Sequence, residues 1–171
     1  MEVFMLSRRN FALGTAALAI TACTRTTSHA NTPEKEPIMT PSEWSTLTEA
    51  QWKERLSDEA FYVLRKEGTE RPWTSPLNDE KRKGTFVCAG CELPLFSSET
   101  KFDSGTGWPS FFAPIEGAVA TKKDFKLVVP RTEYHCSRCG GHQGHVFKDG
   151  PRPTGLRYCN NGVALDFVPE A

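Results

Sequence analysis

Two cysteine pairs with the same spacing constrain this chain more than any other feature. Cys88-Ala-Gly-Cys91 and Cys136-Ser-Arg-Cys139 are both CxxC, and residues 92–135 lie between them. A tight turn with two residues between its thiolates directs both sulfurs at one ion, and two such turns complete a tetrahedron. Gly90 and Gly140 supply the permissive backbone that such turns need. The spacing predicts one structural Zn²⁺ per chain, with no coordination position left for water.

Two other uses of these four cysteines stay open. An exported chain could join them in disulfides, because disulfides persist in oxidising compartments. A CxxC pair could also carry out thiol redox chemistry in a thioredoxin fold, although no βαβ pattern surrounds either pair. A measurement of the zinc content separates these alternatives from the metal site.

The first residues predict an export signal. Ser7-Arg8-Arg9-Asn10-Phe11 precedes an apolar run at 11–22, which is too short to span a bilayer. The arginine pair resembles a twin-arginine signal, which exports prefolded proteins, and residues 20–23 resemble a lipobox. We therefore expect a signal peptide at 1–22 and a periplasmic or envelope protein, with a lipid anchor on Cys23. Cleavage after Ala30, which would release a soluble periplasmic protein, and a buried first helix are the alternatives.

Composition separates a tether from one domain. Residues 23–45 are rich in Thr, Pro, Ser and charge, so we expect a flexible tether before a domain at 46–171.

The charges of the chain balance, because Lys and Arg together number 21, and Asp and Glu together also number 21. This balance gives no basic surface for nucleic acid, so we expect no nucleic-acid partner. Residues 46–171 show no heptads or apolar stripe, so we expect a monomer.

Helical signals come first in the domain and strand signals follow. Thr48 and Gln51 form a capping box, and a second helix begins at Ser57-Asp58-Glu59, with acids in its first turn, and is closed by Gly68. Short β-like runs lie between turn signals, and 104–107 and 149–153 are expected loops. The pattern predicts a mainly β (α+β) fold with N-terminal helices. The expected strands are 85–88, 125–129, 132–135, 146–147 and 163–167.

Cys159 stands outside both pairs and has polar neighbours. A lone cysteine is more often a small buried hydrophobe than a nucleophile. Arg157, however, lies two residues earlier, on the same face of an extended chain, and a guanidinium favours the reactive thiolate. Two asparagines follow and can bind a polar substrate group. His142 and His145 add imidazoles, although each could be an ordinary polar residue or a metal ligand.

Five motifs together resemble the methionine-R-sulfoxide reductases, the B type of peptide methionine sulfoxide reductase. They occur in the family's order over nearly all of 46–168. The resemblance implies two small antiparallel sheets with N-terminal helices, and a four-cysteine zinc site opposite the active site. The motifs are Gly68-Thr-Glu-Arg-Pro72, Cys88 to Phe96, Phe102 to Phe111, Gly144 to Pro151 and Arg157 to Asn161.

The resemblance also implies roles. Cys159 would attack the sulfoxide sulfur, giving a sulfenic acid and methionine. Trp108 would hold the substrate's methyl group, with Phe147 also at the substrate. His142, His145 and Asn161 would surround the sulfoxide oxygen. This oxygen must gain protons as sulfur is attacked, so an imidazolium nearby is suitable chemistry. Arg157 and Asp149 would tune the cysteine and its loop.

Two positions depart from the family. Thr106 stands where members commonly carry a second, resolving cysteine, and Asn160 stands where an aliphatic residue is common. We therefore expect an external thiol, such as a thioredoxin-like protein, to reduce the sulfenic acid. The expected function is repair of protein-bound, and less well of free, methionine-R-sulfoxide in the cell envelope. The alternative is a non-catalytic zinc-ribbon-like binding module, which would need neither Cys159 nor Trp108.

Overall fold

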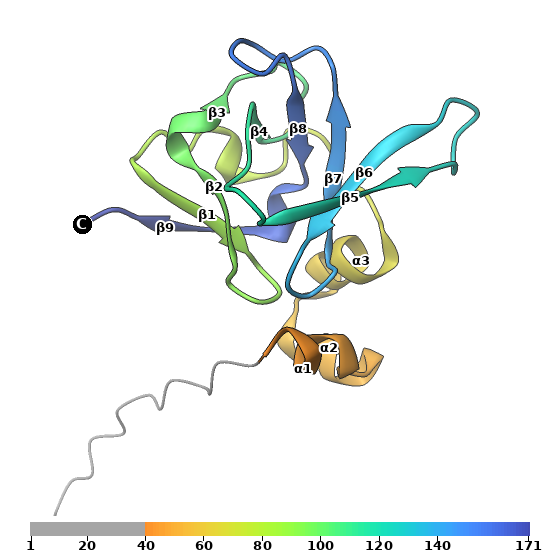
Figure 1. The fold of residues 1–171 in the computed structure, drawn as a ribbon. Coiled ribbons are helices and arrows are strands. Elements are labelled where there is room, and N and C mark those ends of the chain that lie inside the picture. The colour runs from red at the N-terminus through yellow and green to blue at the C-terminus, as the bar shows by residue number, and fades with distance from the viewer. Residues whose placement is uncertain (1–39) are drawn as a thin grey trace, which may run out of the picture. The chain divides into compact units, whose positions relative to one another are not determined.

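Three short helices open the computed structural model, which describes residues 40–171. They are α1 (Pro41–Thr46), α2 (Glu49–Arg55) and α3 (Asp58–Lys66), labelled in Figure 1. The side chain of Thr48 accepts from the backbone N–H of Gln51, and that of Ser57 accepts from Ala60, so both predicted helix starts are confirmed. Glu67, not Gly68, takes the left-handed conformation that ends α3, with φ 52°.

Helix α1 overlaps the end of the expected tether at 23–45, so residues 41–45 are helical and are not part of a flexible tether. Its Trp44 is only 8 % exposed. The Trp44 ring stacks on that of Trp52, with centroids 5.7 Å apart, so burial of these aromatic faces orders the segment. The expected signal peptide, Cys23, Ala30 and the tether up to residue 39 lie outside the described residues. Within 40–171 no helix is long and apolar enough to cross a membrane.

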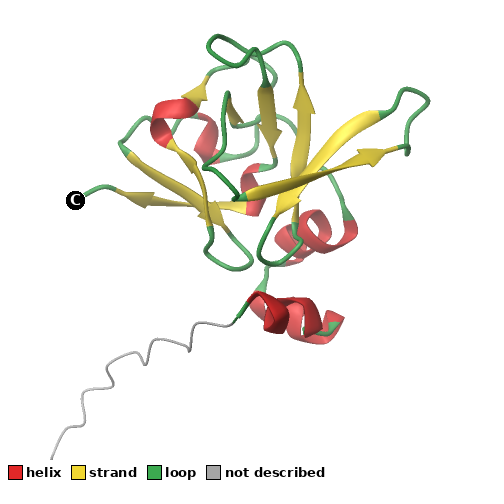
Figure 2. Ribbon diagram, viewed as in Figure 1, coloured by secondary structure: helices red, strands yellow, loops and turns green. Residues whose placement is uncertain are grey.

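The strands form two antiparallel sheets, which confirms the expected mainly β class (Figure 2). The smaller sheet has the order β2-β1-β9, with β1 (Gly84–Cys88), β2 (Pro94–Ser97) and β9 (Leu165–Pro169). The larger has the order β3-β4-β8-β7-β6-β5, with β3 (Lys101–Phe102), β4 (Ser110–Phe111), β5 (Val119–Asp124), β6 (Arg131–Cys136), β7 (His142–Phe147) and β8 (Arg157–Asn160). Short 3₁₀ helices occupy Pro76–Asn78, Ser98–Thr100 and Gly162–Ala164.

An aromatic core joins the two sheets. Phe86 and Phe96 of the smaller sheet pack against Phe111 of the larger, with ring centroids 4.9 and 4.2 Å away. Tyr134 on β6 is fully buried beside Tyr158 on β8, and their centroids are 5.3 Å apart. Burying rings of this size is the main favourable term in such a core. Because β4, β6 and β8 all contribute to it, the core packs the larger sheet against the smaller one.

The expected strand at 125–129 is wrong. The hairpin strand is β5, over the more polar residues before it, and 125–130 form the turn into β6. Phe125 and Val129 are each 72 % exposed there. An apolar β-branched run resembles a strand, but the side chain of Asp124 accepts from the backbone N–H of Lys126 and begins the turn. The other expected strands are present, although the one at 163–167 starts only at Leu165.

Candidate active site

Cys159 lies in a cavity of about 190 Å³ on the larger sheet. On β8 it pairs with Ser110 of β4 on one side and with His145 of β7 on the other. Gly144 permits this close approach, because a Cβ there would lie 1.9 Å from the carbonyl oxygen of Cys159. The structure thus brings Cys159, Trp108, His145, Phe147 and Asn161 together. The full lining is Thr69, Trp108, Arg131, Gly144, His145, Phe147, Cys159, Asn160 and Asn161.

Two opposing influences act on the Cys159 thiol. Burial raises its pKa, whereas the positive charge of Arg157 and a hydrogen bond from the Thr106 hydroxyl lower it, and burial prevails. Arg157 does not line the cavity but is fixed beside it, because it donates to both carboxylate oxygens of Asp149 at 2.9 and 2.8 Å. Its guanidinium also lies over the Phe147 ring, 4.4 Å from the centroid. Ionisation of the thiol therefore depends on Arg157, which Asp149 positions.

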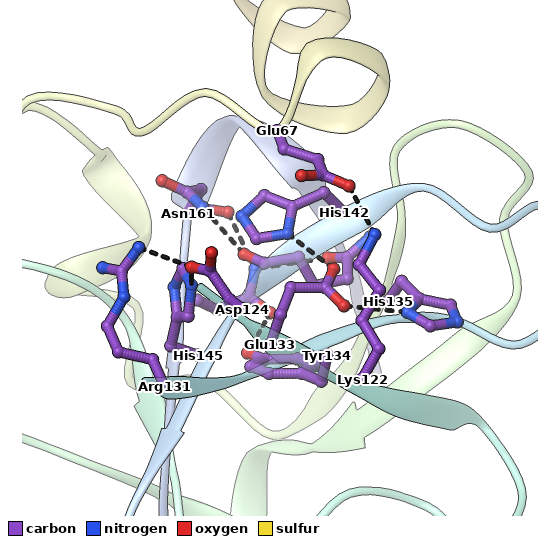
Figure 3. Close-up of polar contacts among 12 residues, drawn as sticks. Glu67, Lys122, Asp124, Arg131, Glu133, Tyr134, His135, His142, His145 and Asn161 are labelled. Carbon is purple, nitrogen blue, oxygen red and sulfur yellow. Dashed lines mark hydrogen bonds and ion pairs between the residues drawn. The ribbon is translucent and has the colours of Figure 1, made fainter. Parts of the chain in front are cut away.

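His145 is held by a carboxylate that the sequence analysis did not identify (Figure 3). Its Nε2 lies 2.8 Å from Oδ2 of Asp124, which also accepts from Nη2 of Arg131 at 2.6 Å. The backbone N–H of Lys126, then His145 and Arg131, hold the pKa of Asp124 well below its ordinary value. Burial lowers the pKa of His145, while Asp124 opposes this shift. Asp124 thus stays ionised and fixes the imidazole.

His142 does not line the cavity, but it packs against His145. It is only 3 % exposed, its Nδ1 lies 2.7 Å from Oε1 of Glu133, and its ring centroid is 5.4 Å from that of His145. Burial opposes ionisation of Glu133, but hydrogen bonds with His142 and His135 prevail and keep its pKa below the ordinary value. His142 therefore influences the cavity through its contact with His145.

Backbone contacts fix the remaining cavity residues. The side chain of Asn161 accepts from the backbone N–H of Glu70 and donates to the carbonyl oxygen of Gln143, both at 2.9 Å. Trp108 donates from Nε1 to the carbonyl oxygen of Glu70 at 3.0 Å, which orients the indole. Asn160 is fully buried and accepts from the Tyr134 hydroxyl at 2.6 Å. These side chains are positioned before any substrate arrives.

Asp124, Arg131 and Glu133 are the site residues that sequence reasoning missed. Arg131 and Glu133 alternate along one strand that leads to Cys136, and charges repeated on one face of a core strand are a detectable signal. Asp124 gives no such signal, because its approach to His145 depends on the β5–β6–β7 pairing.

The four paired cysteines form a buried cluster away from this cavity. Their Sγ atoms all lie within 4.8 Å of one another, and none of the four residues lines the cavity. Cys88 and Cys139 are 3.7 Å apart, and Cys91 and Cys136 are 3.5 Å apart. These distances exceed an S–S bond of about 2.05 Å and approach the edge of about 3.8 Å for a tetrahedron with Zn–S of 2.3 Å. The cluster is therefore suited to hold a metal.

Polar contacts support the cluster and connect it to the cavity. Arg65 donates to the carbonyl oxygen of Cys139, and Arg138 to that of Cys91, both at 2.9 Å. The side chain of Gln143 donates to Sγ of Cys88 at 3.4 Å, while its backbone carbonyl oxygen accepts from the side chain of Asn161. Gln143 thus contacts both the metal-binding cluster and a residue of the cavity.

Comparison with known proteins finds one family over most of the domain. The SelR domain matches residues 56–169. A peptide methionine sulfoxide reductase MsrB of Agrobacterium fabrum is 52 % identical over 123 residues, which are 71 % of this chain and 91 % of that protein. The MsrB of Pseudomonas putida is 55 % identical over 121 residues, 70 % of this chain and 91 % of its own. The chloroplastic peptide methionine sulfoxide reductase B1 of Arabidopsis thaliana is 50 % identical over 125 residues, 72 % of this chain and 62 % of its own.

Proposed function

The chain belongs to the SelR-domain family of MsrB-type peptide methionine sulfoxide reductases and is a methionine-R-sulfoxide reductase, and we propose that the Cys159 cavity is its active site. One observation carries this proposal. Of the five cysteines in residues 40–171, only Cys159 lies outside the metal-binding cluster, and it shares its cavity with two aromatic rings and an imidazole. A binding module would have no use for that combination.

Cys159 supplies the electron pair. Its thiolate attacks the sulfoxide sulfur, the sulfur–oxygen bond breaks, and the oxygen passes to the cysteine as a sulfenic acid. The substrate sulfur is reduced by two electrons to methionine, and the Cys159 sulfur is oxidised by two. One proton is taken up at the oxygen, and His145 is the proton donor that lines the cavity. Asp124 orients His145, and His142 packs behind it.

The apolar and the polar side chains of the cavity bind different parts of the substrate. Trp108 and Phe147 line the cavity and accommodate the methyl group and the side-chain methylenes. Asn161 lies on the polar side with His145 and faces the sulfoxide oxygen. Arg157, held by Asp149, favours the thiolate and acts through Cys159 alone.

The four-cysteine cluster binds Zn²⁺ in this proposal. Cys88, Cys91, Cys136 and Cys139 offer four sulfurs at tetrahedral spacing, the donor set of structural zinc sites. Zinc held in this way stabilises the fold and leaves no position for a substrate.

Regeneration and location complete the proposal. In residues 40–171 no second cysteine lies in the cavity, and Thr106 lies beside Cys159, so an external thiol of a thioredoxin-like protein reduces the sulfenic acid.

The Arg8–Arg9 signal and the Cys23 lipobox support export to the envelope, with cleavage after Ala30 as the soluble alternative. Oxidised proteins there are the substrates, and the protein acts as a monomer.

A stereospecific assay tests this function. The purified protein, supplied with dithiothreitol, is expected to reduce the R epimer of a methionine sulfoxide peptide and not the S epimer. Cys159→Ser is expected to keep its fold and metal content and to lose turnover, because an alcohol is far less ionised than a thiol. Turnover in that variant, or a preference for the S epimer, would contradict the assignment.

A further inference from the structure

A second and larger hollow adjoins the proposed active site. Its volume is about 740 Å³, within the range of ligand sites, whereas the 190 Å³ cavity suits a single side chain. We call it the α3 groove, because residues of α3 form one wall and residues of the Gly162–Ala164 turn and β9 form the other. Its buried floor includes Val63 and Leu165, and its exposed rim includes Glu59, Tyr62 and Asp166.

One ridge separates the groove from the cavity. Thr69 lines both hollows, while Asn161 lines the cavity and its neighbour Gly162 lines the groove. Glu70 ties the ridge together, because its backbone N–H donates to Asn161 and its carboxylate accepts from the backbone N–H groups of Gly162 and Val163. A chain that places one side chain in the cavity therefore meets the groove directly beside it.

The rim of the groove carries an excess of negative charge. Glu59, Glu70 and Asp166 line it, against one cation, Arg71. The carboxylate of Glu70 is used by the backbone and by the hydroxyl of Thr74. Among the described residues, Glu59 and Asp166 have no ion-pair partner. Burial, and then the charge of Glu92, raise the pKa of Asp166. A nearby cation would lower this pKa and favour the ionised carboxylate.

We propose that the α3 groove binds the stretch of polypeptide adjoining the oxidised methionine of a protein substrate, and that it favours a stretch with apolar and basic side chains. This inference rests on the proposed function. An extended chain advances about 3.3 Å per residue, so the first few neighbours of the methionine lie over the groove. Apolar side chains of the substrate pack against the exposed Tyr62 ring and the half-buried Phe167 ring, and a basic one pairs with Asp166 or Glu59.

Matched substrates test the inference. Two peptides, Lys-Leu-Met(R-sulfoxide)-Leu-Lys and its counterpart with Glu in place of both Lys, are compared with N-acetyl-methionine-R-sulfoxide, which is too small to reach the groove. The native protein is expected to show kcat/KM about fivefold higher for the Lys peptide, the effect of an exposed ion pair. Asp166→Lys is expected to remove or invert this ratio and to leave kcat/KM for the small substrate unchanged.

Controls separate the groove from the reaction. Glu116→Lys changes an exposed acid that lines neither hollow, and it should leave the peptide ratio as it is. Glu59→Lys tests the same rim if Asp166→Lys does not fold. Equal kcat/KM for the two peptides, or a ratio unchanged in both rim variants, would overturn the groove alone. If the native protein reduced none of the three substrates, the proposed function itself would be contradicted.

Discussion

At the scale of single residues, the chemistry depends on how buried groups are charged. Burial opposes the thiolate of Cys159, and Arg157 with Thr106 partly restores it. Burial also favours neutral His145, which Asp124 opposes. The pKa of each reactive group therefore depends on a neighbour that does not line the cavity, Arg157 for Cys159 and Asp124 for His145. Removing Arg157 should raise the pKa of Cys159, and removing Asp124 should lower the pKa of His145.

Arg157→Met is expected to move the ionisation of Cys159 to higher pH. The methionine retains much of the side chain but removes the charge that favours the thiolate, so only the Thr106 hydrogen bond still opposes the effect of burial. Alkylation of Cys159 and kcat/KM, each measured against pH, should both shift upward, with lower rates at neutral pH. Arg152→Met, at an exposed residue that lines neither hollow, is the control. An unchanged or lower transition would contradict this role for Arg157.

Asp124→Asn is expected to lower kcat about 10- to 100-fold, less than the roughly 10²- to 10⁴-fold contribution of a general acid itself, because Asp124 acts through His145. The amide keeps the size of Asp124 but loses the charge that orients His145 and raises its pKa. An NMR titration of His145 should show its pKa lower than in the native protein. Asp103→Asn, an exposed site, serves as the control. A loss of activity with an unchanged His145 titration would show that Asp124 is merely structural.

At the scale of elements, local signals could be predicted and long-range pairings could not. The starts of α2 and α3 follow from Thr48 and Ser57, whose side chains bond within their own helix. The two CxxC turns are equally local, and Gly140 has the left-handed φ of 69° that its turn needs. Strand β5 and its pairing with β6 could not be predicted, because the apolar run at 125–129 is a better strand by composition than β5. Cross-strand register, which sequence does not show, decides that pairing and places Asp124 at His145.

Helix α3 supports the cysteine cluster, so truncating its buried face is expected to weaken both fold and metal binding. A side chain at Gly90 or Gly141 would meet the methyl groups of Leu64, and Gly141 also lies near Sγ of Cys139. Leu64→Ala should cost about 2–5 kcal/mol of unfolding free energy. Chemical denaturation and the rate of metal loss to a chelator measure the two effects. Lys66→Ala, on the exposed face of α3, should change both the unfolding free energy and the rate of metal loss only a little.

At the scale of the whole molecule, the metal-binding cluster and the aromatic core both stabilise the arrangement of the strands. Cys136→Ser is expected to release the metal and to unfold most of the protein. Structural zinc contributes about 10–16 kcal/mol in small zinc-finger peptides, which is comparable with the total stability of a domain. Metal analysis and far-UV circular dichroism measure both outcomes. A folded, active preparation of the native protein without zinc would contradict the structural role of the metal.

The oxidation state of Cys159 after one turnover tests the central claim most directly. The native protein, given one equivalent of methionine-R-sulfoxide peptide and no reductant, is digested and analysed by mass spectrometry. The account predicts one methionine formed per chain, one oxygen on Cys159 that a dimedone-type reagent traps, and four unmodified cysteines in the metal-binding cluster. An oxygen on any other residue, or a disulfide between Cys159 and another cysteine of the chain, would contradict it.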